Sequence, residues 1–258
     1  MLRFADQVAG AWEDLMALAV PVDCVCCGAE DRALCVQCQR RLRFLTREPF
    51  RAESGAPALM DVDGSVLLPV VAAGVYREEL AQSLLSFKRH GQQHLRQCLA
   101  GALAGAVRAA MPDDGGGVVL VPVPTGTAAY LSRGFSPVHL LLAGAVRHLP
   151  GAVVADVLAG GGREGWLSGR PHGSSGGGQK GLGRGARASR VRGSMRVRRP
   201  DVAGRRCIIV DDVLTTGATL SEAARALRAG EAKVAGAVVL AAARPPDAAF
   251  AGGAAVPL

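Results

Sequence analysis

Two adjacent acidic residues follow an apolar run late in the sequence, and a threonine- and glycine-rich turn comes directly after them. Residues 208–220 read IIVDDVLTTGATL, which places the carboxylates of Asp211 and Asp212 at the end of a predicted buried strand. Proteins with a parallel α/β sheet bind ligands at the carboxyl ends of their strands. The turn over 214–219 offers backbone N–H groups and hydroxyls at the start of a predicted helix, which are the components of a phosphate site. A strand ending in acids with an ordinary capping turn is the alternative interpretation.

Five of the seven cysteines lie between positions 24 and 38. Cys24 with Cys27, and Cys35 with Cys38, form two C-x-x-C pairs, and four thiolates at this spacing favour tetrahedral zinc. Cys26 offers another thiolate, but the two-residue gap favours Cys24 as the partner of Cys27. Such a closed set leaves no open coordination position, so the predicted zinc is structural. Free reduced cysteines or a redox pair are the alternative.

The elements that must position these residues alternate between strand-like and helical patterns. This alternation predicts an α/β fold with a parallel sheet flanked by helices. The expected strands lie in VLLPVVAAGVY, VVLVPVP, RRCIIVDDV and VAGAVVLAA, and the expected helices span 78–87, 95–110, 137–149 and 220–227.

Composition suggests three parts. Residues 1–47 form a zinc-binding module that begins with a short amphipathic helix, residues 48–65 are a turn-rich linker, and residues 66–258 form the α/β domain. A flexible Gly/Arg-rich loop over 160–190 interrupts that domain. Acidic residues break up every apolar run near the N-terminus, so we expect no membrane insertion and a cytoplasmic protein.

The charge of the chain is concentrated in one segment. The 258 residues carry a net charge of +8, with 49% hydrophobic and 20% charged residues, which excludes wholesale disorder. Residues 160–206 alone carry +10, which indicates an anionic partner, either a nucleic acid or a phosphorylated small molecule. A solvated basic loop is the alternative. Aromatic residues make up only 4%, which argues against a nucleic-acid binder that stacks bases on exposed rings.

The segment VDDVLTTGAT resembles the signature of the type I phosphoribosyltransferases, which bind phosphoribosyl pyrophosphate. The resemblance implies that Asp211 and Asp212 hold the ribose 2′ and 3′ hydroxyls. It implies a 5′-phosphate site formed by Thr215, Thr216, Gly217, Ala218 and Thr219. The residue types suit these roles, because carboxylates accept hydrogen bonds from a diol and Gly217 permits a close backbone approach to a phosphate.

The order of the motifs is similar to that of the ComF family of competence-associated, phosphoribosyltransferase-like proteins. A four-cysteine motif is followed by VYREELAQSLLSFKRHGQQHL, VPVPTGTAAYLSRGF, QKGLGRGAR and the ribose-phosphate signature. By this resemblance the loop that begins at Val123-Pro124-Thr125 faces pyrophosphate, with Arg133-Gly134-Phe135 nearby. The Asn-Gln that usually follows Phe in the family is Ser136-Pro137 here.

Two functions follow from these observations. The first is Mg²⁺-dependent phosphoribosyl transfer to an unknown acceptor, with Lys88 and Arg133 near the leaving pyrophosphate and Asp211 and Asp212 near the ribose. The alternative is a non-catalytic accessory protein in DNA uptake during transformation, which contacts single-stranded DNA or a helicase-like partner. The five histidines, among them His139, are interpreted as surface residues.

Overall fold

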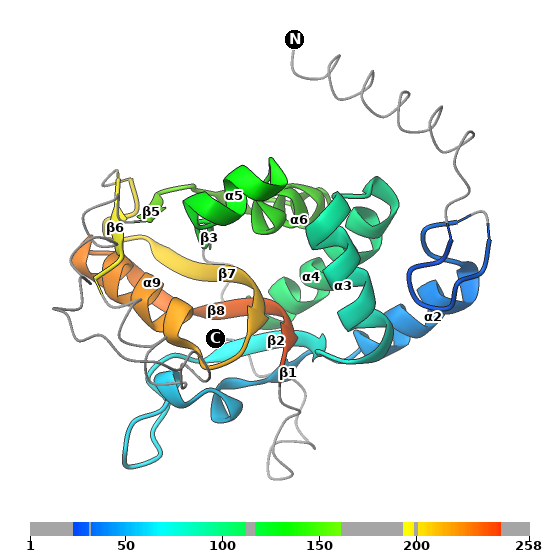
Figure 1. Ribbon diagram of the computed structural model, residues 1–258. Coiled ribbons are helices and arrows are strands. Elements are labelled where there is room, and N and C mark those ends of the chain that lie inside the picture. Colours follow the sequence, from blue (N-terminus) through cyan, green and yellow to red (C-terminus); the bar gives the residue numbers. More distant parts are fainter. Residues whose placement is uncertain (1–22, 31, 112–116, 161–192, 199–200, 244–258) are drawn as a thin grey trace, which may run out of the picture.

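The computed structural model describes residues 23–30, 32–111, 117–160, 193–198 and 201–243. A six-stranded sheet in the order β1-β2-β8-β7-β3-β4 forms its centre, and β5 and β6 form a separate antiparallel pair (Figure 1). All neighbours in the large sheet run parallel except β1 and β2, which confirms the predicted parallel α/β architecture. The strands are β1 (Phe50–Arg51), β2 (Val70–Val75), β3 (Val118–Pro122), β4 (Val153–Val154), β5 (Leu158–Gly160), β6 (Met195–Val197), β7 (Arg206–Leu214) and β8 (Lys233–Ala242).

Helices cover both faces of this sheet (Figure 1). One face packs against α2 (Val36–Leu45), α3 (Glu78–His90), α4 (Gln93–Ala110) and α6 (Pro137–Ala145). The other face packs against α9 (Ala218–Ala229) and against the segment 52–59. The remaining elements are α5 (Thr127–Arg133) and the short 3₁₀ turns η1 (Glu53–Gly55), η2 (Pro57–Leu59) and η3 (Val146–His148).

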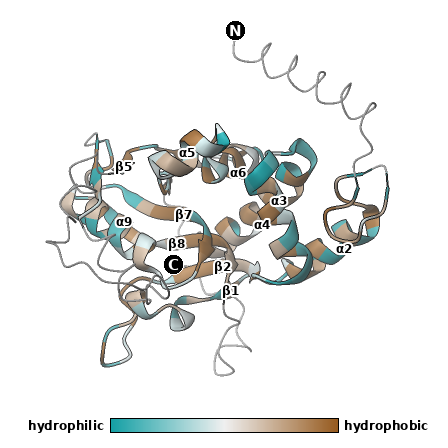
Figure 2. Ribbon diagram, in the orientation of Figure 1, coloured by the Kyte–Doolittle hydropathy of each residue, from teal (hydrophilic) through white to brown (hydrophobic). Residues whose placement is uncertain are grey.

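The strands are apolar on both faces because each side of the sheet is covered. In β7, Ile208 and Val210 join the core beneath α4 and α6, while Cys207 and Ile209 join the core beneath α9. Figure 2 shows the resulting brown colour along β8 and β2 and over the middle of β7. Continuous apolar runs of this kind are typical of buried parallel strands.

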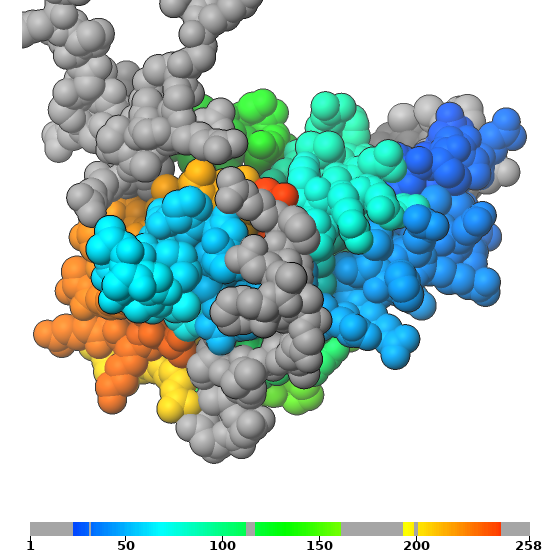
Figure 3. Space-filling model, turned by 90° about the horizontal axis from the view of Figure 1, so that it is seen from below, coloured from blue at the N-terminus to red at the C-terminus, as the bar shows by residue number. Residues whose placement is uncertain are grey.

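The segment 48–65 carries structure of its own, although its turn-rich composition led us to interpret it as a linker. It supplies β1, which pairs with β2, and the turns η1 and η2. Leu59 is fully buried, and the segment lies beside α9 when the molecule is seen from below (Figure 3). Its Gly and Pro residues therefore shape turns that pack onto the sheet.

The cysteine-containing segment shares the main core. Leu34 and Leu42 belong to the same buried cluster as α3 and α4. No helix in the described ranges combines the length and the apolarity that a membrane crossing requires. The expected N-terminal amphipathic helix and all but the first residue of the expected 160–190 loop lie outside the described residues.

Candidate functional site

Asp211 and Asp212 lie in β7, close to its carboxyl end. The strand continues past both acids to Leu214, because Val213 and Leu214 still pair with Ala241 and Ala242 of β8. The apolar run stops at the two acids as expected, while the strand itself goes on. On the other side of β7, the amide of Val123 donates to the carbonyl of Val210 at 2.9 Å. The residues that follow β3 therefore begin directly beside the aspartate pair.

The carboxyl group of Asp211 is buried next to a second carboxyl group, that of Asp212. The amide of Asp212 donates to Asp211 Oδ1 at 2.8 Å. Burial and then the neighbouring Asp212 carboxylate raise the pKa of Asp211 to about 7, although the Asp212 amide and Lys88 act in the opposite direction. Such a group gains stabilisation from a cation or from hydroxyl donors that arrive with a ligand.

Lys88 forms an ion pair with Asp212 at the end of α3. Its Nζ lies 2.8 Å from Oδ1, and the two side chains are 23% and 18% exposed. The neighbouring Phe87 is fully buried and contacts the ring of Phe135 at a centroid distance of 6.0 Å. The helix ends at Gly91, whose φ of 65° allows the chain to turn away. This packing fixes Lys88 over the aspartate pair.

Residues 215–219 connect β7 to the N-terminus of α9. Gly217 caps the helix with a φ of 80°, and a Cβ at this position would collide with the side chain of Leu59. The amide of Ala58 donates to the carbonyl of Thr216 at 3.0 Å. The segment 56–59 thus packs against the loop and supports it. The sequence did not reveal this contact, because it joins distant parts of the chain.

The loop presents polar groups at a helix N-terminus. Thr215 is exposed and Thr216 and Thr219 are half-buried, while the Ala218 amide lies 3.5 Å from the Thr216 hydroxyl. The first-turn amides of a helix lack carbonyl partners within the helix and carry its positive end. This arrangement suits a phosphate group, and it lies immediately after the two carboxylates.

Arg133 ends α5 and is exposed. Within the described part of the chain it forms no ion pair. Its neighbour Gly134 has a φ of 78° and its amide donates to Tyr130. Phe135 then packs on Phe87, so the structure ties the Arg133 turn to the helix that carries Lys88. The resemblance assigns Arg133 and Lys88 to the same end of the substrate, and the contact between the rings of Phe87 and Phe135 links the two elements that carry them.

A polar network follows the ends of β3 and β4. The hydroxyl oxygens of Thr125 and Ser136 are 2.7 Å apart, Ser136 Oγ lies 2.7 Å from His139 Nδ1, and His139 Nε2 lies 3.3 Å from Asp156 Oδ1. We call these four residues the His139 network. The prediction of a surface role for His139 did not anticipate these partners. Ser136 is the N-cap residue of α6 and lies three residues before His139, and this spacing was the available signal.

The sulfur atoms of Cys24, Cys27, Cys35 and Cys38 lie within 4.8 Å of one another, and Cys27 and Cys35 are 3.7 Å apart. Zinc–sulfur bonds of about 2.3 Å in a tetrahedron put sulfurs about 3.8 Å apart, so the cluster could hold a metal ion of this kind. Burial raises the pKa of Cys24, but hydrogen bonds from the backbone amides of Cys35, Cys26 and Cys27 outweigh burial and lower the pKa to about 6.

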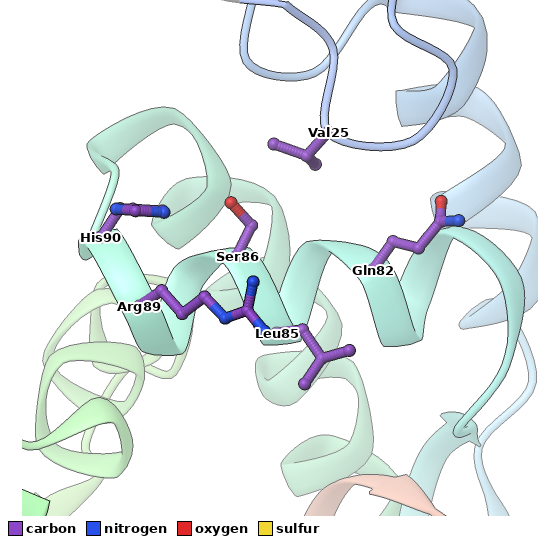
Figure 4. A pocket seen from close by; sticks show the side chains of 6 residues that line it. All are labelled: Val25, Gln82, Leu85, Ser86, Arg89 and His90. Carbon is purple, nitrogen blue, oxygen red and sulfur yellow. The ribbon is translucent and has the colours of Figure 1, made fainter.

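The sulfur of Cys26 is not part of this four-sulfur cluster. This Sγ lies 3.6 Å from Ser83 Oγ and 3.8 Å from the Glu79 carbonyl oxygen, both on α3. Next to it, a groove of about 290 Å³ separates Val25 from the outer face of α3 (Figure 4). Its other lining residues are Gln82, Leu85, Ser86, Arg89 and His90. Lys88, which contacts Asp212, is not among them.

Comparison with known proteins addresses the C-terminal part of the chain. Residues 175–249 match the model of the phosphoribosyl transferase domain, a stretch that includes β7, the loop 215–219, α9 and β8. No curated protein sequence matches the chain. The match, taken with the mostly parallel sheet and the aspartate pair at its edge, supports a type I phosphoribosyltransferase-like domain in this chain.

Proposed function

We propose that the chain binds phosphoribosyl pyrophosphate and transfers its phosphoribosyl group to an acceptor. One observation carries this proposal: the carboxylates of Asp211 and Asp212 lead, within a few residues, into a glycine-containing loop at the N-terminus of α9, inside the matched domain. Carboxylates accept hydrogen bonds from a vicinal diol, and helix N-termini favour phosphate. A ribose 5-phosphate has both groups.

The electrostatics of the pair support a ribose site. Asp211 is costly to ionise in the unliganded protein, because burial and Asp212 raise its pKa. Two ribose hydroxyls would each donate to a carboxylate and offset that cost. The loop 215–219 would bind the 5′-phosphate. The hydroxyls of Thr215, Thr216 and Thr219 and the backbone amides around Gly217 and Ala218 would donate hydrogen bonds to it.

The leaving pyrophosphate needs positive charge. Lys88 stands beside Asp212 at 2.8 Å, and Arg133 is exposed on a turn held against Phe87. We assign both cations to the pyrophosphate end of the substrate. Mg²⁺, when bound with the substrate, would neutralise further pyrophosphate charge and make the group leave more readily. The carboxylates would meanwhile stabilise positive charge that develops on the ribose.

The four-cysteine cluster fits a structural zinc in this proposal. Its Cys38 and the neighbouring Leu42 belong to the core shared with α3, so a bound metal would stabilise the helix that carries Lys88. The order of motifs further supports membership in the ComF family and a cytoplasmic role linked to DNA uptake or nucleotide metabolism.

Ligand-induced stabilisation tests the proposal. Phosphoribosyl pyrophosphate with Mg²⁺ should raise the melting temperature, because a ligand at roughly one hundred times its Kd stabilises the folded state by about 2.7 kcal/mol. Asp211→Asn combined with Asp212→Asn should abolish the rise. Asp63→Asn, an exposed carboxylate that accepts from the Ser65 amide, is the matched control and should respond like wild type. An undiminished response in the double variant would place the site elsewhere.

The second candidate is a non-catalytic protein that binds single-stranded DNA or a helicase-like partner, and the charge of +10 over residues 160–206 favours it. Release of pyrophosphate in the presence of a panel of nucleobases separates the two functions. Glutamine substitutions of four arginines address the charge directly. The four residues are Arg184, Arg187, Arg190 and Arg192. If the chain is an enzyme, their replacement should abolish substrate binding. If it is a DNA-binding protein, their replacement should abolish salt-sensitive DNA affinity.

A further inference from the structure

The His139 network connects the carboxyl ends of neighbouring parallel strands. Asp156 follows β4, Thr125 follows β3, and β3 lies between β4 and β7 in the sheet. Because the amide of Val123 donates to the carbonyl of Val210, the chain leaves β3 beside the strand segment that holds Asp211. Thr125 is therefore the member of the network next to the proposed substrate site.

The protonation state of His139 sets the direction of the two hydrogen bonds that join its ring, through Ser136, to Thr125. When the ring is neutral and Nε2–H donates to Asp156, Nδ1 must accept from the Ser136 hydroxyl. Ser136 then accepts from the Thr125 hydroxyl, and only lone pairs of Thr125 remain for a ligand. In this state Thr125 repels an anion.

A proton on His139 reverses this order. Both ring nitrogens then donate, Nε2 to Asp156 and Nδ1 to Ser136, so Ser136 donates its own proton to Thr125. The hydroxyl proton of Thr125 is released from the network and can be donated to a ligand. One proton taken up at a partly exposed histidine thus converts Thr125 from a hydrogen-bond acceptor into a donor.

We propose that His139, with Asp156 as its counter-ion, couples proton uptake to the binding of the anionic pyrophosphate group at Thr125. The inference rests on the proposed function, because it takes the pyrophosphate end of that substrate as the anion. A pyrophosphate oxygen accepts hydrogen bonds and therefore selects the state in which Thr125 donates. His139 and Asp156 are positioning residues that act through Ser136 and Thr125.

The same coupling would assist departure of the leaving group. The acceptor nucleophile forms a bond to the ribose anomeric carbon while the bond from that carbon to the pyrophosphate oxygen breaks, and the electron pair of the broken bond stays on that oxygen. The donated hydrogen bond from Thr125 becomes stronger as this charge develops. No bond to the protein forms, and the proton on His139 remains shared between the imidazolium and Asp156.

Other charged groups surround this edge of the sheet. Asp156 contacts His139 directly, at 3.3 Å, and its side chain is 54% exposed. Asp211 and Asp212 on β7 and Lys88 on α3 lie around the neighbouring strand end. Asp211 can release a proton when a ligand binds, because its pKa is raised in the unliganded protein. The contribution of His139 must therefore be measured as a difference between wild type and variants.

The test is calorimetric titration of the full chain with inorganic pyrophosphate and Mg²⁺ near neutral pH, in buffers of different ionisation enthalpy. The buffer dependence of the heat gives the number of protons taken up. Wild type should take up more protons than His139→Gln, by up to about one per pyrophosphate, since linkage limits a single group to one proton. Ser136→Ala should lose the same increment, although it keeps the histidine.

Two further variants sharpen the result. His148→Gln alters an exposed histidine on η3 outside the network and should match wild type. Asp156→Asn changes an exposed side chain, so folding is preserved, and it should reduce the uptake. Equal proton uptake in wild type, His139→Gln and Ser136→Ala would overturn the inference, as would absence of pyrophosphate binding by wild type. Phosphoribosyl pyrophosphate, titrated in parallel, shows whether the proposed function itself fails.

Discussion

Substitution of Gly217 by alanine should damage the loop in two separable ways. The φ of 80° is a left-handed conformation, which costs a residue with a Cβ roughly 1–2 kcal/mol. The new methyl group would also meet the buried side chain of Leu59, and overpacking of this kind typically costs about 1–3 kcal/mol. We therefore expect Gly217→Ala to lower the free energy of unfolding by about 2–5 kcal/mol, the sum of these two costs.

A double-mutant cycle separates the two costs. Leu59→Ala alone should destabilise the protein by about 2–5 kcal/mol, because it leaves a cavity in the core beneath α9. In that background the collision is removed, and Gly217→Ala should cost only the backbone contribution of roughly 1–2 kcal/mol. The coupling between the two positions should therefore be about 1–3 kcal/mol, in the sense that the double variant is more stable than additivity predicts.

Urea denaturation of wild type, both single variants and the double variant gives the four free energies of unfolding. The denaturant slopes must agree among them before the values are compared. Additive effects, within about 0.5 kcal/mol, would show that Leu59 does not support the loop at Gly217 and would refute this reasoning.

Two other predictions concern the cysteine cluster and Asp211. Purified protein should contain zinc in a ratio near one per chain, and Cys35→Ser should lower the zinc content and destabilise the protein. Cys26→Ser should retain the metal, because the sulfur of Cys26 contacts Ser83. Equal zinc contents in the two variants would contradict the assignment. Because the pKa of Asp211 rises from 3.8 in the unfolded chain to about 7 in the folded one, the folded state binds the extra proton between these values. The stabilisation from this proton is fully present below pH 3.8 and is lost as the pH rises to about 7. Wild type should therefore lose stability over this window relative to Asp211→Asn. Parallel pH profiles of the two free energies of unfolding, measured by urea denaturation, would argue against the pKa shift.

Local patterns were sufficient to predict β7, α9 and β8 within the matched stretch, whereas the short strand β6 was not predicted. The apolar run before Asp211 predicts β7, and the helix after Gly217 ends at Gly230 as its sequence indicates. The parallel arrangement followed from the alternation of strands and helices, because short connections leave few topologies open. The grouping of Cys24 with Cys27 also followed from spacing, and Cys26, whose sulfur contacts Ser83, is not part of the four-sulfur cluster.

Contacts between distant segments could not be predicted in this way. Nothing in the composition of residues 56–59 indicates that Leu59 lies beneath Gly217, because the two positions meet only after the sheet has formed. The pairing of His139 with Asp156 likewise depends on the neighbouring ends of β3 and β4. Lys88 was assigned to the leaving group, and only the packing of α3 reveals its ion pair with Asp212.

Hydrogen exchange in the presence of phosphoribosyl pyrophosphate and Mg²⁺ tests the central claim most directly. The account predicts slower exchange of the amides over 214–220 in wild type, and no such protection when Asp211→Asn and Asp212→Asn are combined. Protection confined to another region, such as the groove between Val25 and α3, with residues 214–220 unchanged, would contradict it.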